Sequence, residues 1–146
     1  MGSNDVSEAL VVVFDTNVLV SAEGYAGTPL ECWLLARTDP RISIATSEGA
    51  IAELARVLEY DRLPISNARR EELLREYRRV AILVEPSERL RVVQDDPDDD
   101  VFIECAVEAD ADYIVSGDSH LTDLGSVRGI EILAPAAFID RLDEDA

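Results

Sequence analysis

Short, almost entirely apolar runs alternate with longer segments of helical periodicity along this chain. The runs are residues 10–14 (LVVVF), 42–45 (ISIA), 81–84 (AILV), 113–115 (YIV) and 130–133 (IEIL). Strands of this kind are typical of a parallel sheet with helices on both faces, because a strand with one solvated face alternates apolar and polar residues instead. The pattern predicts an α/β domain with three layers, α/β/α, around a central, mainly parallel sheet of about five strands.

The segments between the runs carry the signals of helices. Ser, Thr or Asp directly before a helix is favoured because its side chain accepts a hydrogen bond from a free backbone N–H, and proline is favoured in the first turn. We expect one helix to begin at Thr16, one to follow Thr46 or Ser47, and further helices at 29–37, 66–80, around 102–109 and at 136–142.

The length of the chain indicates a single domain. With 146 residues it can bury one core but is too short for two ordinary domains. We expect the domain to span residues 9–142, with flexible ends at 1–8 and 143–146. No apolar run has the length of a membrane span, and the first residues lack the pattern of a secretion signal. The expected location is therefore the cytoplasm, where Cys32 and Cys105 should stay buried, free thiols.

The charge of the chain is strongly negative. Its formal net charge is -18, and all 13 basic residues are arginine. Such a surface resembles that of halophilic proteins, although a G+C-rich genome also favours Arg over Lys. An acidic protein repels nucleic acid at ordinary ionic strength, but at molar salt the Debye length falls to about 3 Å. The net charge therefore does not exclude RNA as a substrate.

Acidic residues follow several of the expected strands. Asp15 ends the first strand, Asp118 follows the fourth within SGDSHL, residues 98–100 precede a helix, and Glu53 lies within the helix after the second strand. Each has an ordinary interpretation: a cap for Asp15 and Asp99, a turn for Asp118, a solvated helix position for Glu53. However, the carboxyl ends of parallel strands meet at one edge of a sheet. Several acids there would repel one another unless a hard divalent cation, Mg²⁺ or Mn²⁺, lay among them.

Three segments resemble one known family, the PIN-domain endoribonucleases, and within it the toxins of toxin-antitoxin systems. They are VVVFDTNVLVSA, ISIATSEGAIAELARVL and DPDDDVFIECAVEADADYIVSGDSHLTDL, and together they span about residues 10–125. The last is the most specific, because a strand, Ser-Gly-Asp and the preceding acid-led helix recur together. The resemblance implies a PIN-like fold for the whole domain.

The resemblance also implies a set of site residues. Four acids would hold one or two Mg²⁺ or Mn²⁺ ions and would be catalytic: Asp15, Glu53, Asp99 and Asp118. Asp99 is chosen because the acid of the family lies three residues before the first core position of its helix, here Phe102, while Asp98 and Asp100 stay open as alternatives. Thr16, Asn17 and Ser116 match supporting positions, where neighbouring groups fix the orientation of metal ligands.

The implied reaction is hydrolysis of an RNA phosphodiester by a metal-activated water, without a covalent intermediate. The products would carry a 5′ phosphate and a 3′ hydroxyl. The implied partners are an RNA substrate, a cognate antitoxin protein and a second copy of the chain in a homodimer. An alternative is a catalytically silent PIN scaffold that binds RNA or protein. Receiver domains and haloacid-dehalogenase-type phosphatases also place an Asp after the first strand, but they usually rely on a Lys, and this chain has none.

Other residues remain open from sequence. His120 replaces an acid found in many relatives, and a surface or rim position is favoured over a ligand. The arginines at 69, 70, 75, 78 and 79 are interleaved with glutamates, so a salt-bridged surface is favoured over contact with phosphates or an acidic partner. Trp33 lies among leucines and is expected in the core or a dimer interface rather than as a platform for RNA bases.

Overall fold

The computed structural model of the chain describes residues 10–25, 27–87 and 100–145. The sheet in this part of the chain is built from the strands β1 (Leu10–Phe14), β2 (Ile42–Thr46), β3 (Ile82–Leu83), β4 (Tyr113–Val115), β5 (Ser126–Val127) and β6 (Ile130–Leu133). The helices are α2 (Thr16–Gly24), α3 (Thr28–Thr38), α4 (Glu48–Val57), α5 (Asn67–Val80), α6 (Asp100–Ala109), α7 (Ser119–Thr122) and α8 (Pro135–Asp145).

The strands form one sheet in the order β3-β2-β1-β4-β6-β5. All pairs are parallel except β5 with β6, which are antiparallel. The predicted fold class, a three-layer α/β domain with a mainly parallel sheet, is therefore confirmed. The sheet has six strands rather than about five, because the two-residue β5 is too short to leave a pattern in the sequence.

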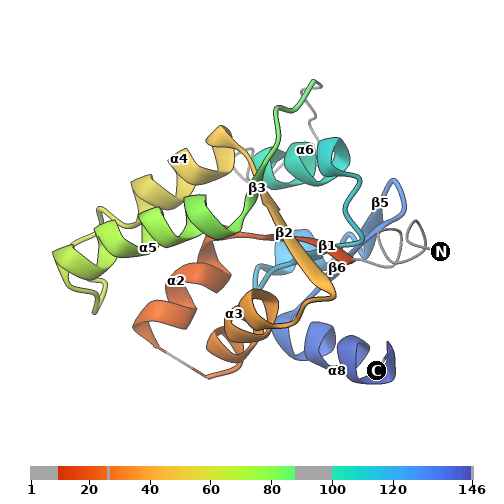
Figure 1. Cartoon of the computed structure of the whole chain (residues 1–146), viewed down its shortest axis with the longest axis horizontal. Helices are drawn as coiled ribbons and strands as arrows, with labels where there is room; N and C mark the ends of the chain where they lie inside the picture. The colour runs from red at the N-terminus through yellow and green to blue at the C-terminus, as the bar shows by residue number, and fades with distance from the viewer. Residues whose placement is uncertain (1–9, 26, 88–99, 146) are drawn as a thin grey trace.

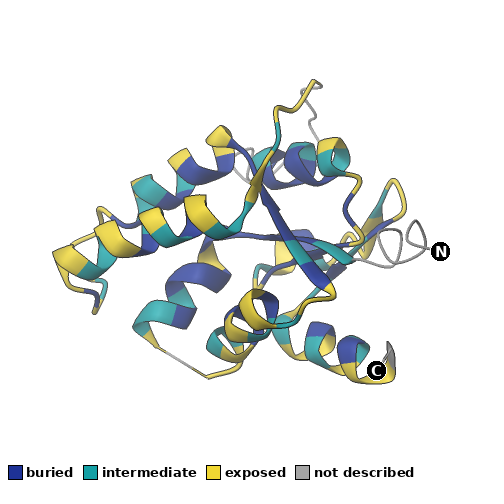
Figure 2. Ribbon diagram, in the orientation of Figure 1, coloured by how far each residue is buried: buried dark blue, intermediate teal, exposed yellow. Residues whose placement is uncertain are grey.

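Helices cover both faces of the sheet, as the apolar strands require (Figure 1). Alternate residues of β1 point to opposite faces: Phe14 packs with residues of α2, α3, α5 and α8, and Val13 with residues of α6 and α7. Helix α4 contributes to both cores, through Leu54 to the first and Ala50 to the second. Figure 2 shows the buried sheet between helices whose outer sides are exposed.

Two serines cap helices as the sequence predicts. The Ser47 hydroxyl accepts a hydrogen bond from the Ala50 N–H at 3.1 Å, so Ser47 rather than Thr46 begins α4. The Ser66 hydroxyl accepts from the Arg69 N–H at the start of α5. Helix α8 runs to residue 145, three residues beyond the predicted end at 142, and α7 and β5 had no counterpart in the sequence-based prediction.

The predicted core positions of Trp33 and the two cysteines are confirmed. Trp33 is 1% exposed, and its ring meets those of Phe14 and Tyr77 edge-on at 6.0 and 5.9 Å. Both cysteines are buried and free. Burial raises the pKa of the Cys32 thiol to about 12 and that of Cys105 to about 11. Neither thiol is therefore a reactive thiolate at neutral pH.

The predicted salt-bridged surface of α5 is confirmed for two of its arginines. The Arg69 guanidinium donates to the carboxylate of Glu23 at 2.6 and 2.8 Å and to that of Glu76 at 3.2 Å. Arg78 donates to Glu48 at 2.9 and 3.1 Å. These pairs tie α5 to α2 and α4. In the described part of the chain, no helix has the length and apolarity needed to cross a bilayer.

Candidate functional site

The carboxyl ends of β1 and β4 lie at the point where the strand order of the sheet reverses. From β1 the chain adds β2 and β3 on one side, then β4 and β6 on the other. In open α/β sheets, ligands bind beyond the strand ends at such a point. Two backbone hydrogen bonds fix the geometry there: Asp15 N–H donates to the Val115 carbonyl at 3.1 Å, and Ser116 N–H donates to the Leu133 carbonyl at 2.9 Å.

Asp15 is a buried acid held by a short chain of hydrogen bonds. Its side chain is almost fully enclosed, with 2% of the residue exposed. One carboxylate oxygen accepts from the Val18 N–H at 3.0 Å, which makes Asp15 the cap of α2. The other accepts from the Ser116 hydroxyl, and the Ser116 oxygen accepts from the Asp118 N–H at 2.9 Å. The structure therefore joins Asp15, Ser116 and Asp118 from the ends of two adjacent strands.

Burial raises the pKa of Asp15 from 3.8 to about 6. The hydrogen bonds from Ser116 and Val18 lower this pKa, and the negative charge of Asp118 raises it further. A carboxyl group shielded from water is costly to ionise unless a positive charge lies near it. The cap interpretation of Asp15 is thus correct but incomplete, because an exposed cap would not carry this cost.

Asp118 caps the short helix α7 and lies at the edge of the same site. Its side chain is 20% exposed and accepts from the His120 N–H at 2.9 Å. The His120 imidazole, 51% exposed, lies 3.8 Å from the same carboxylate oxygen. His120 is therefore on the rim, as the sequence favoured, with its backbone rather than its ring in hydrogen-bond contact with Asp118.

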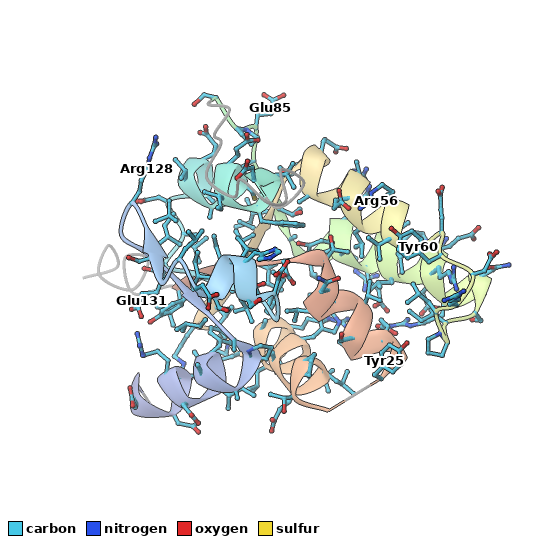
Figure 3. The ribbon with its side chains drawn as sticks, turned by 180° about the vertical axis from the view of Figure 1, so that it is seen from behind. Tyr25, Arg56, Tyr60, Glu85, Arg128 and Glu131 are labelled. Carbon is cyan, nitrogen blue, oxygen red and sulfur yellow. The ribbon has the colours of Figure 1, made fainter. Side chains whose placement is uncertain are left out.

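Glu53 lies on α4, and its carboxylate is paired with an arginine. Arg56 Nε donates to Glu53 Oε1 at 2.9 Å, and a second guanidinium nitrogen contacts the same oxygen. Arg56 also donates to the Tyr60 hydroxyl at 3.0 Å. Figure 3 labels Arg56 and Tyr60 near the end of α4. The Glu53 side chain is only 14% exposed, so it is not the freely solvated acid of the ordinary interpretation.

The choice of Asp99 lies outside the described residues, as does its neighbour Asp98. The other neighbour, Asp100, is the first residue of α6 and is 6% exposed. Within residues 10–25, 27–87 and 100–145, no group of three or more His, Cys, Asp or Glu side chains is arranged to hold a metal ion. The four-acid site therefore stays a prediction, of which the structure brings two members together.

The supporting residues differ in how they contribute. Ser116 is fully buried and hydrogen-bonded to Asp15, as described above. The backbone N–H of Asn17 helps to lower the pKa of Asp15, whereas Asn17 itself is exposed. Thr16 is 5% exposed, and its hydroxyl has no hydrogen-bond partner among the described residues. A buried hydroxyl without a partner beside a buried carboxylate is a group that a ligand or water could satisfy.

Two further buried polar residues lie near the strand ends, and neither was predicted as a site residue. The hydroxyls of Thr46, at the end of β2, and Tyr77, on α5, have no hydrogen-bond partner of good geometry in the described chain. Burial raises the pKa of Tyr77, the nearby Thr46 hydroxyl lowers it, and electrostatic interactions with Cys105 and Asp15 raise it further. Thr46 was detectable as a polar residue ending a strand, but nothing in the Arg-rich sequence of α5 marks Tyr77.

The donor chemistry of the site fits a hard divalent cation. The groups assembled at the ends of β1 and β4 are carboxylates and hydroxyls, with Asp15 and Asp118 close enough for one charge to raise the pKa of the other. Oxygen donors of this kind suit Mg²⁺ and Mn²⁺, and a bound cation would offset both the burial of Asp15 and its repulsion by Asp118. The described residues therefore bring together two carboxylates whose chemistry would suit such an ion.

Comparison with known proteins agrees with this architecture. The solved structure of VapBC2 from Rickettsia felis, bound to a DNA fragment from their promoter, matches with a TM-score of 0.57 at 15% sequence identity. The match covers 84% of this chain and 97% of that chain, and at this identity it shows only that the two share a fold. Among curated proteins none matches the chain. The sequence profile of the PIN domain family matches residues 11–120. The chain therefore belongs to the PIN domain family.

Proposed function

We propose that this chain is a metal-dependent endoribonuclease that hydrolyses RNA phosphodiester bonds. The observation that supports this best is the Asp15 carboxyl, buried at the strand-order reversal, joined through Ser116 to Asp118 and carrying a pKa of about 6. Such a group is costly for stability and useful for holding a cation. Membership of the PIN domain family, whose members are typically nucleases, supports the same assignment.

The proposed roles follow from the chemistry of each residue. Asp15 and Asp118 would hold Mg²⁺ or Mn²⁺, with Glu53 and Asp99 as the remaining ligands and Asp98 or Asp100 as alternatives to Asp99. When bound, the cation lowers the pKa of a water that attacks phosphorus and neutralises charge on the phosphoryl oxygens. Ser116 orients the Asp15 carboxylate, and the N–H groups at the start of α2 keep it in place. Glu53 would have to exchange its contact with Arg56 for the cation.

The same proposal includes a toxin role with an antitoxin partner. The Rickettsia felis structure that shares the fold is a VapBC2 assembly on its promoter DNA, which supports a protein partner for the PIN component. A homodimer and a cytoplasmic setting with high salt belong to the same proposal, the salt because the chain has a net charge of -18.

One observation favours the alternative of a silent scaffold that binds RNA or protein. Glu53 is neutralised by Arg56, and the described residues contain no group of three acids arranged for a metal ion. A scaffold would keep that arrangement, whereas a nuclease must rearrange it when the cation binds. The two functions therefore differ in whether divalent cations change the protein.

The test is cleavage of a mixed panel of single-stranded RNAs with Mg²⁺ or Mn²⁺ at high salt, with Asp15→Asn as the matched variant. We expect cleavage by the wild type to fall at least about 100-fold in the variant, because loss of one metal ligand removes most of the stabilisation of the developing charge. The products should carry 5′ phosphates. If both proteins are inert with every RNA and either cation while still binding RNA, the scaffold is correct and the nuclease proposal is wrong.

A further inference from the structure

Exposed aromatic rings are confined to two tyrosines. The chain has eight aromatic residues (three Phe, one Trp, four Tyr), all within the described part, and six of them are buried. The exceptions are Tyr25, 67% exposed, and Tyr60, 51% exposed. An exposed tyrosine offers apolar ring area together with a polar hydroxyl, and such side chains are enriched where proteins bind partners.

The two tyrosines lie at the same end of the molecule. Tyr25 follows the last residue of α2, and Tyr60 lies in the turn after α4. Gly24 lies beside Pro64, which follows that turn, because a Cβ added to the glycine would lie 3.4 Å from the proline ring, an ordinary van der Waals contact. Figure 3 labels both tyrosines, together with Arg56, on the side where α2 and α4 end.

Arg56 connects Tyr60 to the proposed cleavage site. Glu53, Arg56 and Tyr60 are spaced i, i+3 and i+7, which places them along one side of α4 and the turn that follows. The guanidinium contacts the Glu53 carboxylate on one side and the Tyr60 hydroxyl on the other, while the Arg56 side chain is 51% exposed. Helix α2 likewise links the site to an exposed tyrosine. Asp15 precedes its first residue and Tyr25 follows its last, about 15 Å away at 1.5 Å per residue.

The net charge of the protein decides what kind of contact could hold RNA here. A chain with a charge of -18 and no lysine cannot draw a polyanion by long-range attraction. Stacking of bases on aromatic rings is insensitive to charge, and an arginine can hold one phosphate by paired hydrogen bonds. Two exposed tyrosines and one arginine provide both kinds of contact, stacking and a phosphate contact.

We propose that Tyr25, Arg56 and Tyr60, here named the tyrosine strip, bind single-stranded RNA beside the cleavage site. The tyrosine rings stack on unpaired bases, and Arg56 turns from Glu53 to a backbone phosphate. This inference rests on the proposed nuclease function and adds the residues that position its substrate. Single strands are required, because bases in a duplex are already stacked on each other.

Binding is measured by fluorescence anisotropy of a short, labelled single-stranded RNA at high salt, in an Asp15→Asn background that prevents cleavage. Tyr25→Ala and Tyr60→Ala should each weaken binding by about tenfold, as expected for loss of one stacked base. Tyr60→Phe keeps the ring and loses only its hydroxyl, so it should bind within about twofold of the parent. Leu34→Ala and Arg75→Ala, which alter exposed residues of α3 and α5, are the controls and should bind unchanged.

The salt dependence gives a second readout. One phosphate contact predicts a slope of log affinity against log salt of about -0.7, far shallower than that of a basic RNA-binding protein. A duplex of the same sequence should bind at least about tenfold more weakly than the single strand. A slope several times steeper, or equal binding of single strand and duplex, would contradict stacking on the tyrosine strip.

Cleavage by proteins with Asp15 intact separates this inference from the function on which it rests. If the wild type cleaves no RNA, the nuclease proposal fails, whatever the tyrosines do. If the wild type cleaves and Tyr25→Ala/Tyr60→Ala matches it in KM and in RNA affinity, the tyrosine strip is not an RNA contact and this inference is wrong. Raised KM with kcat little changed is the expected result, because stacking holds substrate and transition state alike.

Discussion

At the scale of single residues, Asp15 is where stability and proposed function conflict. Asp15 directly follows the hydrophobic strand β1, and only 2% of the residue is exposed. Two hydrogen bonds, from Val18 and Ser116, recover part of the cost of burying it, but the pKa still rises to about 6. In the metal-free protein, ionisation of Asp15 therefore opposes folding near neutral pH.

This conflict predicts the pH dependence of stability. Below pH 3.8 Asp15 is protonated in both states, and between pH 3.8 and about 6 the folded protein keeps a proton that the unfolded chain has released. The favourable contribution is therefore complete below the unfolded pKa and is lost as the pH rises through the folded pKa. The loss amounts to about 3 kcal/mol at pH 7. Asp15→Asn removes this loss. The free energy of unfolding of the variant, relative to that of the wild type, should therefore rise by about 3 kcal/mol between pH 4 and pH 7.

Urea denaturation of EDTA-treated protein at constant high salt, across this pH range, measures the difference. Comparing the two proteins cancels the titration of the other acids. Added Mg²⁺ at pH 7 should stabilise the wild type and leave Asp15→Asn unaffected, which is the control. Free energies of unfolding that run parallel from pH 4 to pH 7 would show that Asp15 does not titrate as described.

The sequence could predict Asp15 and Asp118 because each follows a recognisable strand, and the topology of a parallel sheet then places them at one edge. The family resemblance predicted Ser116 as a supporting residue, but not that its hydroxyl joins the two acids, since that depends on the register of β1 against β4, where Phe14 lies opposite Val115. Nor could it predict the pairing of Glu53 with Arg56. Both residues were visible, but the choice of partner on a helix surface depends on rotamers rather than on spacing alone.

At the scale of elements, helix caps and apolar runs were predictable, and short elements outside an apolar run were not. Ser47 and Ser66 begin α4 and α5 because their hydroxyls accept from N–H groups three residues on, a local interaction that sequence spacing contains. The four-residue α7 and the two-residue β5 carry no periodicity. They form because the chain must cross between β4 and β6, which is a tertiary requirement.

Arg70 makes contacts between elements that the sequence composition did not predict. It belongs to the arginine-rich run of α5, but its guanidinium donates to backbone carbonyls rather than to a carboxylate. The acceptors are the carbonyls of Leu58, of Leu63 at 3.1 Å and of Ile65 at 2.9 Å. Arg70 thus provides a charged donor to carbonyls at the end of α4 and in the loop that leads into α5, one of which, that of Leu63, also accepts from the Ile65 N–H at 2.8 Å.

We therefore expect Arg70→Ala to destabilise the protein by about 2–3 kcal/mol, since it leaves several carbonyls of one loop without their charged donor. Arg75→Ala, which removes an exposed arginine from the same helix, should change stability by less than about 0.5 kcal/mol. Chemical denaturation at fixed salt compares the two. Equal effects of the substitutions would mean that Arg70 contributes only general positive charge.

At the scale of the whole molecule, the charge of -18 acts on every element at once. Ion pairs such as Arg69 with Glu23 and Arg78 with Glu48 neutralise acids locally, but the 31 acidic residues outnumber the 13 basic ones, so many acids have no basic partner to neutralise them. Folding concentrates these charges, and the repulsion destabilises the compact state. Salt shortens the Debye length from about 10 Å at 0.1 M to about 3 Å at 1 M.

The melting temperature should therefore rise steeply with salt. For a domain of this size, each kcal/mol of repulsion removed adds roughly 3 °C, so a gain of roughly 10 °C between 0.1 and 2 M KCl corresponds to about 3 kcal/mol. Sorbitol at equal osmolality separates screening from solvent exclusion. A variant with Glu71→Gln, Asp123→Asn and Asp140→Asn, all exposed positions, should melt higher at 0.1 M and gain less from added salt. A melting temperature independent of KCl, or identical salt curves for both proteins, would mean that pairing already balances the excess of acids and that the composition reflects codon usage rather than a salty environment.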